Sequence, residues 1–304
     1  MKNTYLFVFL FSTVILFAQG NTSSIAEAEM KSASQMMAFA SNPNTANYDV
    51  TYHKLEFTVN PSVFFITGKV TTTFTALSNM STVTFDLTNE LTVSSVTKNG
   101  TPLTFVQNSN NELVITLPTV QTAGTSATVV INYSGAPSQG EDAFTIDTHN
   151  GTPILFTLSE PYGARDWWPC KQDLNDKINS IDIYITAPSA YVSVANGKQM
   201  GLVTNLNTTK TTHFKHNHPI PAYLVAIAVT NYQVFTQTAG TAPNTFPIVN
   251  YIYPENFTSA QASLAVTLPI MDLFEDLFET YPYEDEKYGH AQFGWGGGME
   301  HTTV

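Results

Sequence analysis

Cysteine is almost missing from this sequence: Cys170 is the only one among 304 residues. A single cysteine excludes an intramolecular disulfide, and with it the class of small disulfide-framed domains. No cysteine follows the apolar run at the amino terminus, so we expect no lipid anchor there. With 43% hydrophobic residues, the chain is long enough for one large domain or two, each with a packed core.

Positive charge is scarce as well. Lys and Arg together number 12, against 24 Asp and Glu, which gives a formal net charge of −12. A surface of that sign repels phosphate groups. The composition therefore argues against nucleic acid and anionic membranes as partners.

Long hydrophobic runs are absent except near the start. Lys2 precedes an apolar run from Tyr5 to Phe17, and small residues at Ala18 and Gly20 suit a cleavage site. The run is too short for a membrane span, so we predict a signal peptide over residues 1–20 and no membrane anchor. An uncleaved anchor is the alternative that this length disfavours. The predicted location is the periplasm or the exterior of the cell.

Residues 21–45 are small and polar, and we interpret them as a linker or an N-terminal extension. From Tyr52 onward, short runs of alternating β-branched and aromatic residues predict strands. They lie at 54–59, 68–77, 81–87, 95–100, 112–117, 127–133, 180–187 and 210–216. The Asn99-Gly100 pair favours a tight hairpin, and the spacing predicts a mainly β domain of antiparallel sheets or a sandwich over residues 46–250.

Two further segments have a different pattern. The apolar run from Tyr223 to Val229 lacks alternation, which predicts a strand buried on both faces. Ser259 could cap a helix, and Pro269 should kink or split it. The helical spacing is carried by Leu264, Leu268, Met271, Leu273, Phe274, Leu277 and Phe278. We therefore predict that a second, helix-containing domain begins at about residue 251 and continues to 304.

The stretch Gly297-Gly298-Met299-Glu300 combines backbone access with a carboxylate. Consecutive glycines let another backbone approach closely, and a carboxylate beside them suits a positively charged group at the end of an extended peptide. A flexible glycine-rich turn with an incidental surface Glu remains the alternative, because short glycine-rich matches are weakly specific.

A second dense stretch covers residues 158–173, LSEPYGARDWWPCKQD. Two adjacent Trp residues, a Pro and the single Cys are flanked by Arg165 and Asp166. By itself such a segment is more typical of a buried structural corner than of a functional site.

Together and in this order, the two stretches resemble the aminopeptidase N family of zinc metallopeptidases, which includes leukotriene hydrolase. The Gly-x-Met-Glu-Asn signature of that family is similar to the sequence from Gly297 to Glu300, and its Ala-Arg-x-x-x-Pro-Cys stretch to Ala164–Cys170. The family has Gln or Glu five residues before that Arg, which is Glu160 here. The resemblance extends from about Tyr52 to the end of the chain. It implies a β-saddle domain followed by the start of an α/β, thermolysin-like catalytic domain.

The resemblance also implies roles for individual residues. Glu160 and Glu300 would bind the free α-ammonium of a peptide substrate, and Gly297 and Gly298 would offer backbone groups to its chain. Met299 would line the pocket for the first side chain, with ordinary packing as an equal alternative. Two departures are His301, where the family has Asn, and residues 171–174, where it has an acidic Asp-Glu-Pro.

The zinc motif of the family, His-Glu-x-x-His, is absent from the sequence. The resemblance therefore implies zinc in a longer parent protein, no catalytic or metal-binding residue within 1–304, and no peptidase activity of this fragment. A separate metal site at His213, His216 and His218 is the weaker alternative. We expect these three histidines to face solvent.

Two other functions remain open. One is a non-enzymatic exported β-sandwich for adhesion or glycan binding, and the other is a relative that has lost its zinc motif and acts as a scaffold. The sequence contains no Gly-x-Ser-x-Gly elbow for a serine nucleophile. Paired carboxylates for sugar hydrolysis depend on a separation in space and also stay open.

Overall fold

The computed structural model describes residue 30 and residues 41–140, 143–295 and 297–304. The predicted signal peptide and most of the predicted extension lie outside these residues. The chain divides into two compact units. The larger comprises residues 41–294 and 300–304 and is described first. The smaller contributes Met30, Trp295 and residues 297–299 to the described part.

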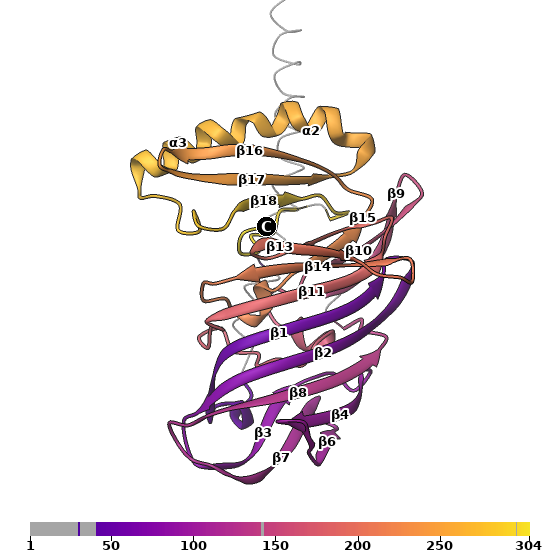
Figure 1. Ribbon diagram of the computed structural model, residues 1–304, viewed down its shortest axis with the longest axis vertical. Helices are drawn as coiled ribbons and strands as arrows, with labels where there is room; N and C mark the ends of the chain where they lie inside the picture. Colours follow the sequence, from indigo (N-terminus) through magenta and orange to yellow (C-terminus); the bar gives the residue numbers. More distant parts are fainter. Residues whose placement is uncertain (1–29, 31–40, 141–142, 296) are drawn as a thin grey trace, which may run out of the picture. The chain divides into compact units, whose positions relative to one another are not determined.

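A long twisted sheet dominates the larger unit (Figure 1). Its strands follow the order β13-β14-β11-β1-β2-β8-β4-β5, and we call it the main sheet. The bounds are β13 (Lys198–Thr204), β14 (Thr209–His216), β11 (Ser180–Pro188), β1 (Tyr48–Asn60), β2 (Val63–Ala76), β8 (Ser126–Gly135), β4 (Thr92–Lys98) and β5 (Thr101–Pro102). Neighbours are antiparallel except β1 and β11, which are parallel.

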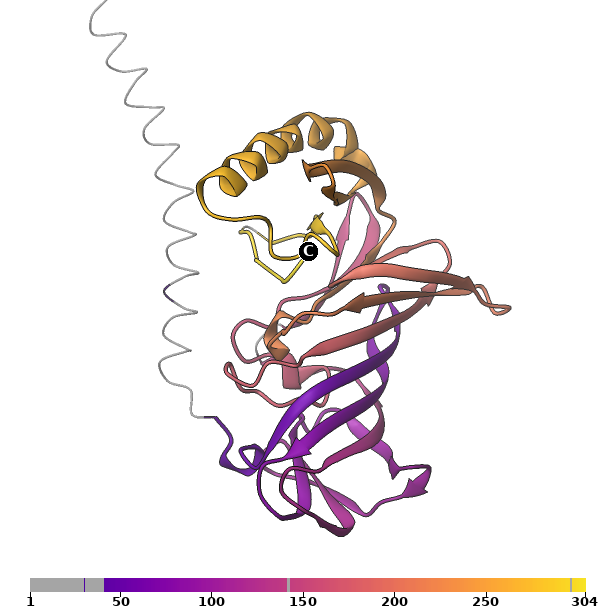
Figure 2. The same cartoon turned by 60° about the vertical axis from the view of Figure 1, so that its left-hand side comes forward.

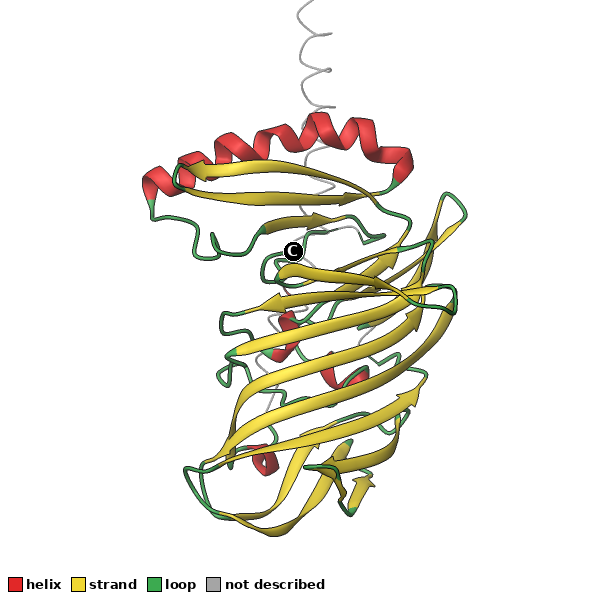
Figure 3. Cartoon of the chain, viewed as in Figure 1, coloured by secondary structure: helices red, strands yellow, loops and turns green. Residues whose placement is uncertain are grey.

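Three smaller sheets complete the strands (Figure 3). One has the order β12 (Val192–Ala195), β15 (Ile227–Thr230), β10 (Thr152–Thr157) and β9 (Phe144–His149). Another consists of β3 (Met80–Asp86), β7 (Glu112–Gln121) and β6 (Phe105–Asn108). The last consists of β16 (Gln233–Thr241), β17 (Asn244–Ile252) and β18 (Tyr288–Ala291). This sheet begins before residue 250, so its strands lie on both sides of the predicted domain boundary.

Alternation explains how the main sheet forms. Along β2 every second side chain from Ile66 to Ala76 is buried, while the residues between them are partly or fully exposed. The buried face packs onto the two tryptophans of the 158–173 stretch, both of which are fully buried. Gly68 lies directly under the ring of Tyr133 on β8, where a Cβ atom would come within 2.3 Å of that ring. The mainly β, largely antiparallel fold predicted from the sequence is confirmed.

The predicted hairpin at Asn99-Gly100 is present between β4 and β5. Both residues have positive φ, 52° and 79°, as a two-residue turn of this type requires. The predicted strand from Tyr223 to Val229 is wrong in its first half. A 3-10 turn, η3 (Ala222–Leu224), precedes β15, whose four residues are all buried as expected.

The helix begins earlier than predicted and is split as predicted. A 3-10 turn, η4 (Pro254–Asn256), leads into α2 (Phe257–Ser263), so Ser259 lies inside the helix and its hydroxyl donates to the carbonyl oxygen of Asn256. Another 3-10 turn, η5 (Leu264–Val266), separates α2 from α3 (Thr267–Leu277), which carries Pro269 in its first turn.

The helical segment packs on the sheet of β16, β17 and β18, but few of its apolar side chains are buried in this contact. Helix α3 packs against β16 (Figure 2), and of its side chains only Met271 is buried. Leu268 is packed at the edge of the same cluster. Large apolar side chains stay exposed on the remaining surface: Ile270, Leu273, Phe274, Leu277 and Phe278. In the described part of the chain, no helix combines the length and the apolar character that a membrane crossing requires.

The larger unit has two parts that matter for the site. We call residues 41–232 the N-terminal lobe, and residues 233–294 with 300–304 the C-terminal lobe. Two short 3-10 turns of the N-terminal lobe, η1 (Pro43–Thr45) and η2 (Ala164–Asp166), lie in its loops. The sequence-predicted site residues Glu160 and Glu300 come from different lobes.

Candidate functional site

Glu160 lies in the 158–173 stretch, a corner that hydrogen bonds of Trp167 hold in place. The indole nitrogen of Trp167 donates to the Ser159 hydroxyl over 2.9 Å, and the Tyr133 hydroxyl donates to the Trp167 carbonyl oxygen over 2.8 Å. Ser159 is fully buried, whereas the next residue, Glu160, is half-buried. The corner is thus a structural support, and its edge presents a carboxylate.

The residues that depart from the family pattern after Cys170 also belong to this support. Lys171 donates to the Tyr48 carbonyl oxygen over 2.7 Å and forms an ion pair with Asp176. The Gln172 side-chain oxygen accepts from the Arg165 backbone nitrogen, 3.2 Å away. These contacts connect the corner to β1 and to its own 3-10 turn, η2. The replacement of the family Asp-Glu-Pro therefore affects the support of the corner and not the Glu160 carboxylate.

Glu300 begins a short terminal segment that is anchored in the N-terminal lobe. Its own side chain is exposed, while the next three residues are buried. The carbonyl oxygen of Thr302 accepts from the Asn196 amide over 2.9 Å, and the Thr303 hydroxyl accepts from the Gly197 backbone nitrogen over 2.7 Å. The position of Glu300 is therefore set by the turn between β12 and β13.

Tyr223 brings the two predicted carboxylates into one electrostatic environment. It lies in η3 and is half-buried. Burial raises the pKa of the Tyr223 phenol, and the charges of Glu160 and Glu300 raise it further, with Tyr162 contributing last. Both carboxylates thus act on the same phenol ring, although 140 residues of chain separate them.

Asn196 connects the two halves of this site. Its buried amide donates to the carbonyl oxygens of Leu224 and Thr302, both over 2.9 Å, and its oxygen accepts from the Ala226 backbone nitrogen over 2.7 Å. One side chain therefore holds both the turn with Tyr223 and the segment with Glu300. Asn196 was not predictable from the sequence, because an Asn-Gly pair after a strand indicates only a turn.

The glycine strip belongs to the smaller unit. The Trp295 ring lies against Gly297, where a Cβ atom would come within 2.6 Å of the ring, so this position requires glycine. A Cβ atom at Gly298 would have no neighbour within 4 Å. Both glycines are exposed and Met299 is half-buried. The roles of Gly297, Gly298 and Met299 in peptide binding stay predictions.

His301, which replaces the family Asn, is buried. Its Nε2 atom has no hydrogen-bond partner among the described residues, and burial lowers the pKa of the imidazole to about 4. The ring is therefore neutral at physiological pH. The hydrogen bonds that fix the Glu300 segment come from the two following threonines instead.

The three clustered histidines each pair with a different carboxylate. His213 lies 2.6 Å from Asp182, His216 lies 2.5 Å from Glu286, and His218 lies 2.8 Å from Asp285. The prediction that all three face solvent is wrong for His216, which is fully buried. Within the described residues, no group of three or more His, Cys, Asp or Glu side chains is arranged to hold a metal ion.

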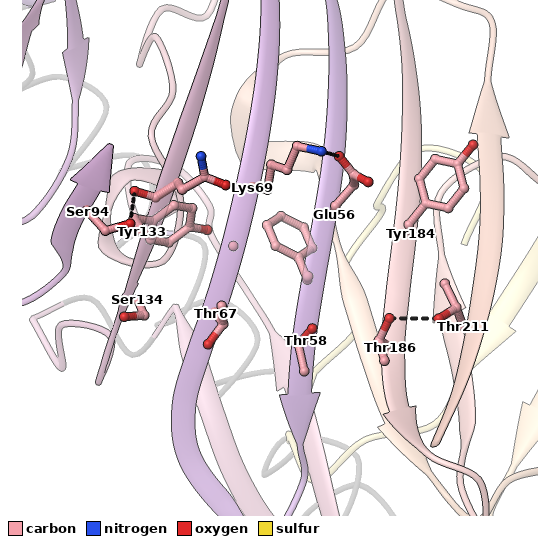
Figure 4. A pocket seen from close by; sticks show the side chains of 13 residues that line it. Glu56, Thr58, Thr67, Lys69, Ser94, Tyr133, Ser134, Tyr184, Thr186 and Thr211 are labelled. Atoms are coloured by element: carbon pink, nitrogen blue, oxygen red, sulfur yellow. Dashed lines mark hydrogen bonds and ion pairs between the residues drawn. The ribbon is translucent and has the colours of Figure 1, made fainter. Parts of the chain in front are cut away.

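A hollow of about 420 Å³ lies on the solvent face of the main sheet (Figure 4). Some of its polar groups are already paired. Lys69 lies 3.1 Å from Glu56, and the hydroxyls of Thr186 and Thr211 are 2.8 Å apart. None of the predicted site residues lines it, so we assign it no function.

Lys287 forms another contact between the lobes, and the pKa of its ammonium group is lower in the folded chain than usual. Its ammonium group donates to the carbonyl oxygens of Ala195 and Gly197 over 2.8 and 2.6 Å, and the residue is 3% exposed. Burial lowers the pKa of Lys287 to about 7, although the neighbouring Glu286 carboxylate acts in the opposite direction.

This lowered pKa predicts a pH-dependent stability. Between about pH 7 and pH 9 the unfolded chain holds a proton on Lys287 that the folded chain has released, so this group adds stability as pH rises. Relative to Lys287→Met, the wild type should gain up to about 1.4 kcal/mol in unfolding free energy per pH unit. Urea unfolding at several pH values measures this, with the exposed Lys177→Met as control. Equal pH slopes in wild type and Lys287→Met would contradict the assignment.

Comparison with known families decides what kind of protein carries this site. The family described as the peptidase M1 N-terminal domain matches residues 44–224, more than half of the chain. The chain belongs to the peptidase M1 family. This confirms the resemblance inferred from the two motif stretches, because the family comprises aminopeptidases of the aminopeptidase N type.

Individual M1 relatives agree with this assignment. Glutamyl aminopeptidase of Rattus norvegicus is 30% identical over 125 residues, which is 41% of this chain and 13% of that protein. Leucine aminopeptidase 2 of Vanderwaltozyma polyspora is 38% identical over 81 residues, or 27% of this chain and 12% of that protein. The chain thus spans only a small fraction of these relatives.

A solved M1 structure has the same fold. A variant of the M1 zinc metallopeptidase from Deinococcus radiodurans, bound to a Tyr-Ser-Ala substrate, superposes with a TM-score of 0.67 at 24% identity. The match covers 80% of this chain and 56% of the other. The fold therefore extends beyond the N-terminal domain into the C-terminal lobe.

Proposed function

We propose that this chain is the N-terminal part of an exported zinc aminopeptidase that releases N-terminal amino acids from peptides. The observation that carries the proposal is the common action of Glu160 and Glu300 on the Tyr223 phenol. Two carboxylates near one half-buried ring provide the negative charge that a free α-ammonium needs. The M1 membership supplies the reaction class.

The two carboxylates select the substrate in this proposal. Each accepts hydrogen bonds from the ammonium group, and hydrogen bonds to charged groups are worth about 1.5–3 kcal/mol. A peptide with a blocked amino terminus loses this energy and leaves two acidic groups without a cation between them. The glycine strip would pair with the backbone of the bound peptide, and Met299 would contact its first side chain.

The residues that the structure describes do not form a zinc site. The described part contains no suitable group of ligands, and the sequence contains no His-Glu-x-x-His motif. In our proposal the metal-binding residues belong to a longer parent protein, and residues 1–304 bind the substrate amine without a catalytic residue of their own. Bound zinc would supply an activated water for peptide hydrolysis.

Activity of the full-length protein tests the proposal. It should hydrolyse unblocked peptides in a chelator-sensitive reaction and leave N-acetylated peptides intact, whereas residues 1–304 alone should be inactive. Zinc-dependent release of amino acids by residues 1–304 would refute the assignment of the metal site. An inactive full-length protein would instead favour the adhesion module or the catalytically dead scaffold.

Export is also part of the proposal, supported by the amino-terminal sequence pattern. Amino-terminal sequencing of the mature protein should give Asn21 as the first residue. A mature protein that starts at Met1 would contradict cleavage after Gly20.

A further inference from the structure

His149 at the end of β9 joins the two lobes through both of its ring nitrogens. Nδ1 lies 2.8 Å from the Glu255 carboxylate of the C-terminal lobe, and Nε2 lies 2.8 Å from the Thr230 hydroxyl of the N-terminal lobe. The side chain is only 7% exposed, and its ring is stacked on Tyr253 with centroids 3.6 Å apart.

The hydrogen-bond partners define the protonation state of this ring. A carboxylate only accepts, so Nδ1 must carry a hydrogen toward Glu255. The Thr230 hydroxyl donates its single hydrogen to the Pro153 carbonyl oxygen, 2.8 Å away, and therefore accepts from Nε2. Both ring nitrogens are donors only in the imidazolium form, so the full set of bonds requires a protonated His149.

Acidic and aromatic side chains surround the His149 ring. Glu255 and Tyr253 face the ring from the C-terminal lobe, and Asp147 lies on the same side of β9. Burial raises the pKa of the Tyr253 phenol, and the charges of Asp147 and Glu255 raise it further, so both carboxylates act at this spot. A cation stacked on an aromatic ring is stabilised by the electrons of that ring.

The other two histidine bridges between the lobes lack this requirement. His216 and His218 each use a single ring nitrogen toward a carboxylate. The second ring nitrogen of His216 has no hydrogen-bond partner in the described residues. A neutral imidazole with one N–H group satisfies either arrangement. Of these three histidine bridges, His149 alone needs a second proton to make its described hydrogen bonds.

Contacts lead from the surroundings of His149 to residues 292–294, which precede the glycine strip in the sequence. The Tyr253 backbone nitrogen donates to the Gln292 side chain over 3.1 Å, and Phe293 packs on Phe156 of β10 with ring centroids 4.8 Å apart. Asp147, two residues before His149, lies against Gly294. Phe293 and Gly294 thus lie against the β9–β10 hairpin that carries His149.

We propose that protonated His149 is a positioning residue, a latch that holds the C-terminal lobe on the N-terminal lobe and loosens when the ring loses its second proton. The evidence for the latch is the pair of contacts from the His149 ring to Glu255 and Thr230. Its consequence, that the Glu300 side of the amine site becomes less well held at higher pH, rests on the proposed function.

Two measurements on the full chain test the latch without any activity assay. Nitrogen-15 NMR of the His149 ring should find both nitrogens protonated while the latch is closed. Hydrogen exchange of the Tyr253 and Asn256 amides, corrected for intrinsic base catalysis, should speed up by as much as tenfold per pH unit once the ring is neutral. A ring with one bare nitrogen at about pH 5, or protection that is independent of pH, would overturn the proposal.

Variants separate the latch from other titrations. His149→Gln should abolish the pH dependence at these two amides, whereas His213→Gln, which breaks a pair inside the N-terminal lobe, should preserve it. The measurements are repeated in Lys287→Met, which removes the opposite linkage of Lys287. An active full-length aminopeptidase with a pH-independent latch would refute only the latch, and a titrating latch in an inactive protein would refute only the proposed function.

Discussion

Replacing Glu300 by Gln in the full-length protein should lower kcat/KM for unblocked peptides by roughly tenfold to a hundredfold. The substitution keeps the shape of the side chain and removes its charge. Each charge-assisted hydrogen bond is worth about 1.5–3 kcal/mol, and about 1.4 kcal/mol corresponds to a factor of ten. Glu160→Gln should have an effect of the same order, because both carboxylates act on one phenol.

The exposure of Glu300 makes this test specific. The side chain lies on the surface, so the thermal midpoint of Glu300→Gln should match that of the wild type. Glu279→Gln, an exposed carboxylate beyond the end of α3, is the matched control and should leave kcat/KM unchanged. Equal activities of the Glu300→Gln and Glu279→Gln proteins would remove Glu300 from the amine site.

Replacing Asn196 by Ala should lower the unfolding free energy by about 3–5 kcal/mol, because three buried backbone groups lose their partner and each costs about 1–3 kcal/mol. These groups are the carbonyl oxygens of Leu224 and Thr302 and the nitrogen of Ala226. Urea unfolding of the chain measures the loss. Asn205→Ala is the control, since the side chain of Asn205 donates to the hydroxyls of Thr209 and Thr211 at the hairpin end.

A second readout separates the local effect from general destabilisation. The Gly197 amide, which donates to Thr303, should lose protection from hydrogen exchange in Asn196→Ala before the strands of the main sheet do. If Asn196→Ala and Asn205→Ala were destabilised equally, Asn196 would not be the link between the two halves of the site.

Local pattern was enough to predict most strands of the N-terminal lobe. Alternation along β2 and the Asn99-Gly100 turn are properties of a few neighbouring residues, and both are present as expected. The parallel pairing of β1 with β11 was not predictable in this way, because its partners are far apart in the sequence. The start of the helix was misplaced for a related reason: η4 supplies the first turn ahead of Ser259, so no side-chain cap is needed there.

Some residues of the candidate site were likewise predictable from local sequence, and others were not. Glu160 and Glu300 stand in stretches with a recognisable motif, so a resemblance was sufficient to propose them. Tyr223 and Asn196 carry no local signal. The first belongs to an apolar run that predicts a strand, and the second to a turn dipeptide. Their importance follows only from the tertiary contacts that bring both lobes together.

The division of the site between the lobes sets an order of assembly. Protein synthesis delivers Glu160 and Tyr223 first, and domains near the amino terminus fold first as the chain emerges. At that stage the Asn196 amide can donate to the Leu224 carbonyl oxygen. Its second acceptor, the Thr302 carbonyl oxygen, is synthesised later. Glu300 arrives last and docks on a prepared surface. In the proposed function, a nascent chain would therefore acquire its pair of amine-binding carboxylates only after both lobes are folded.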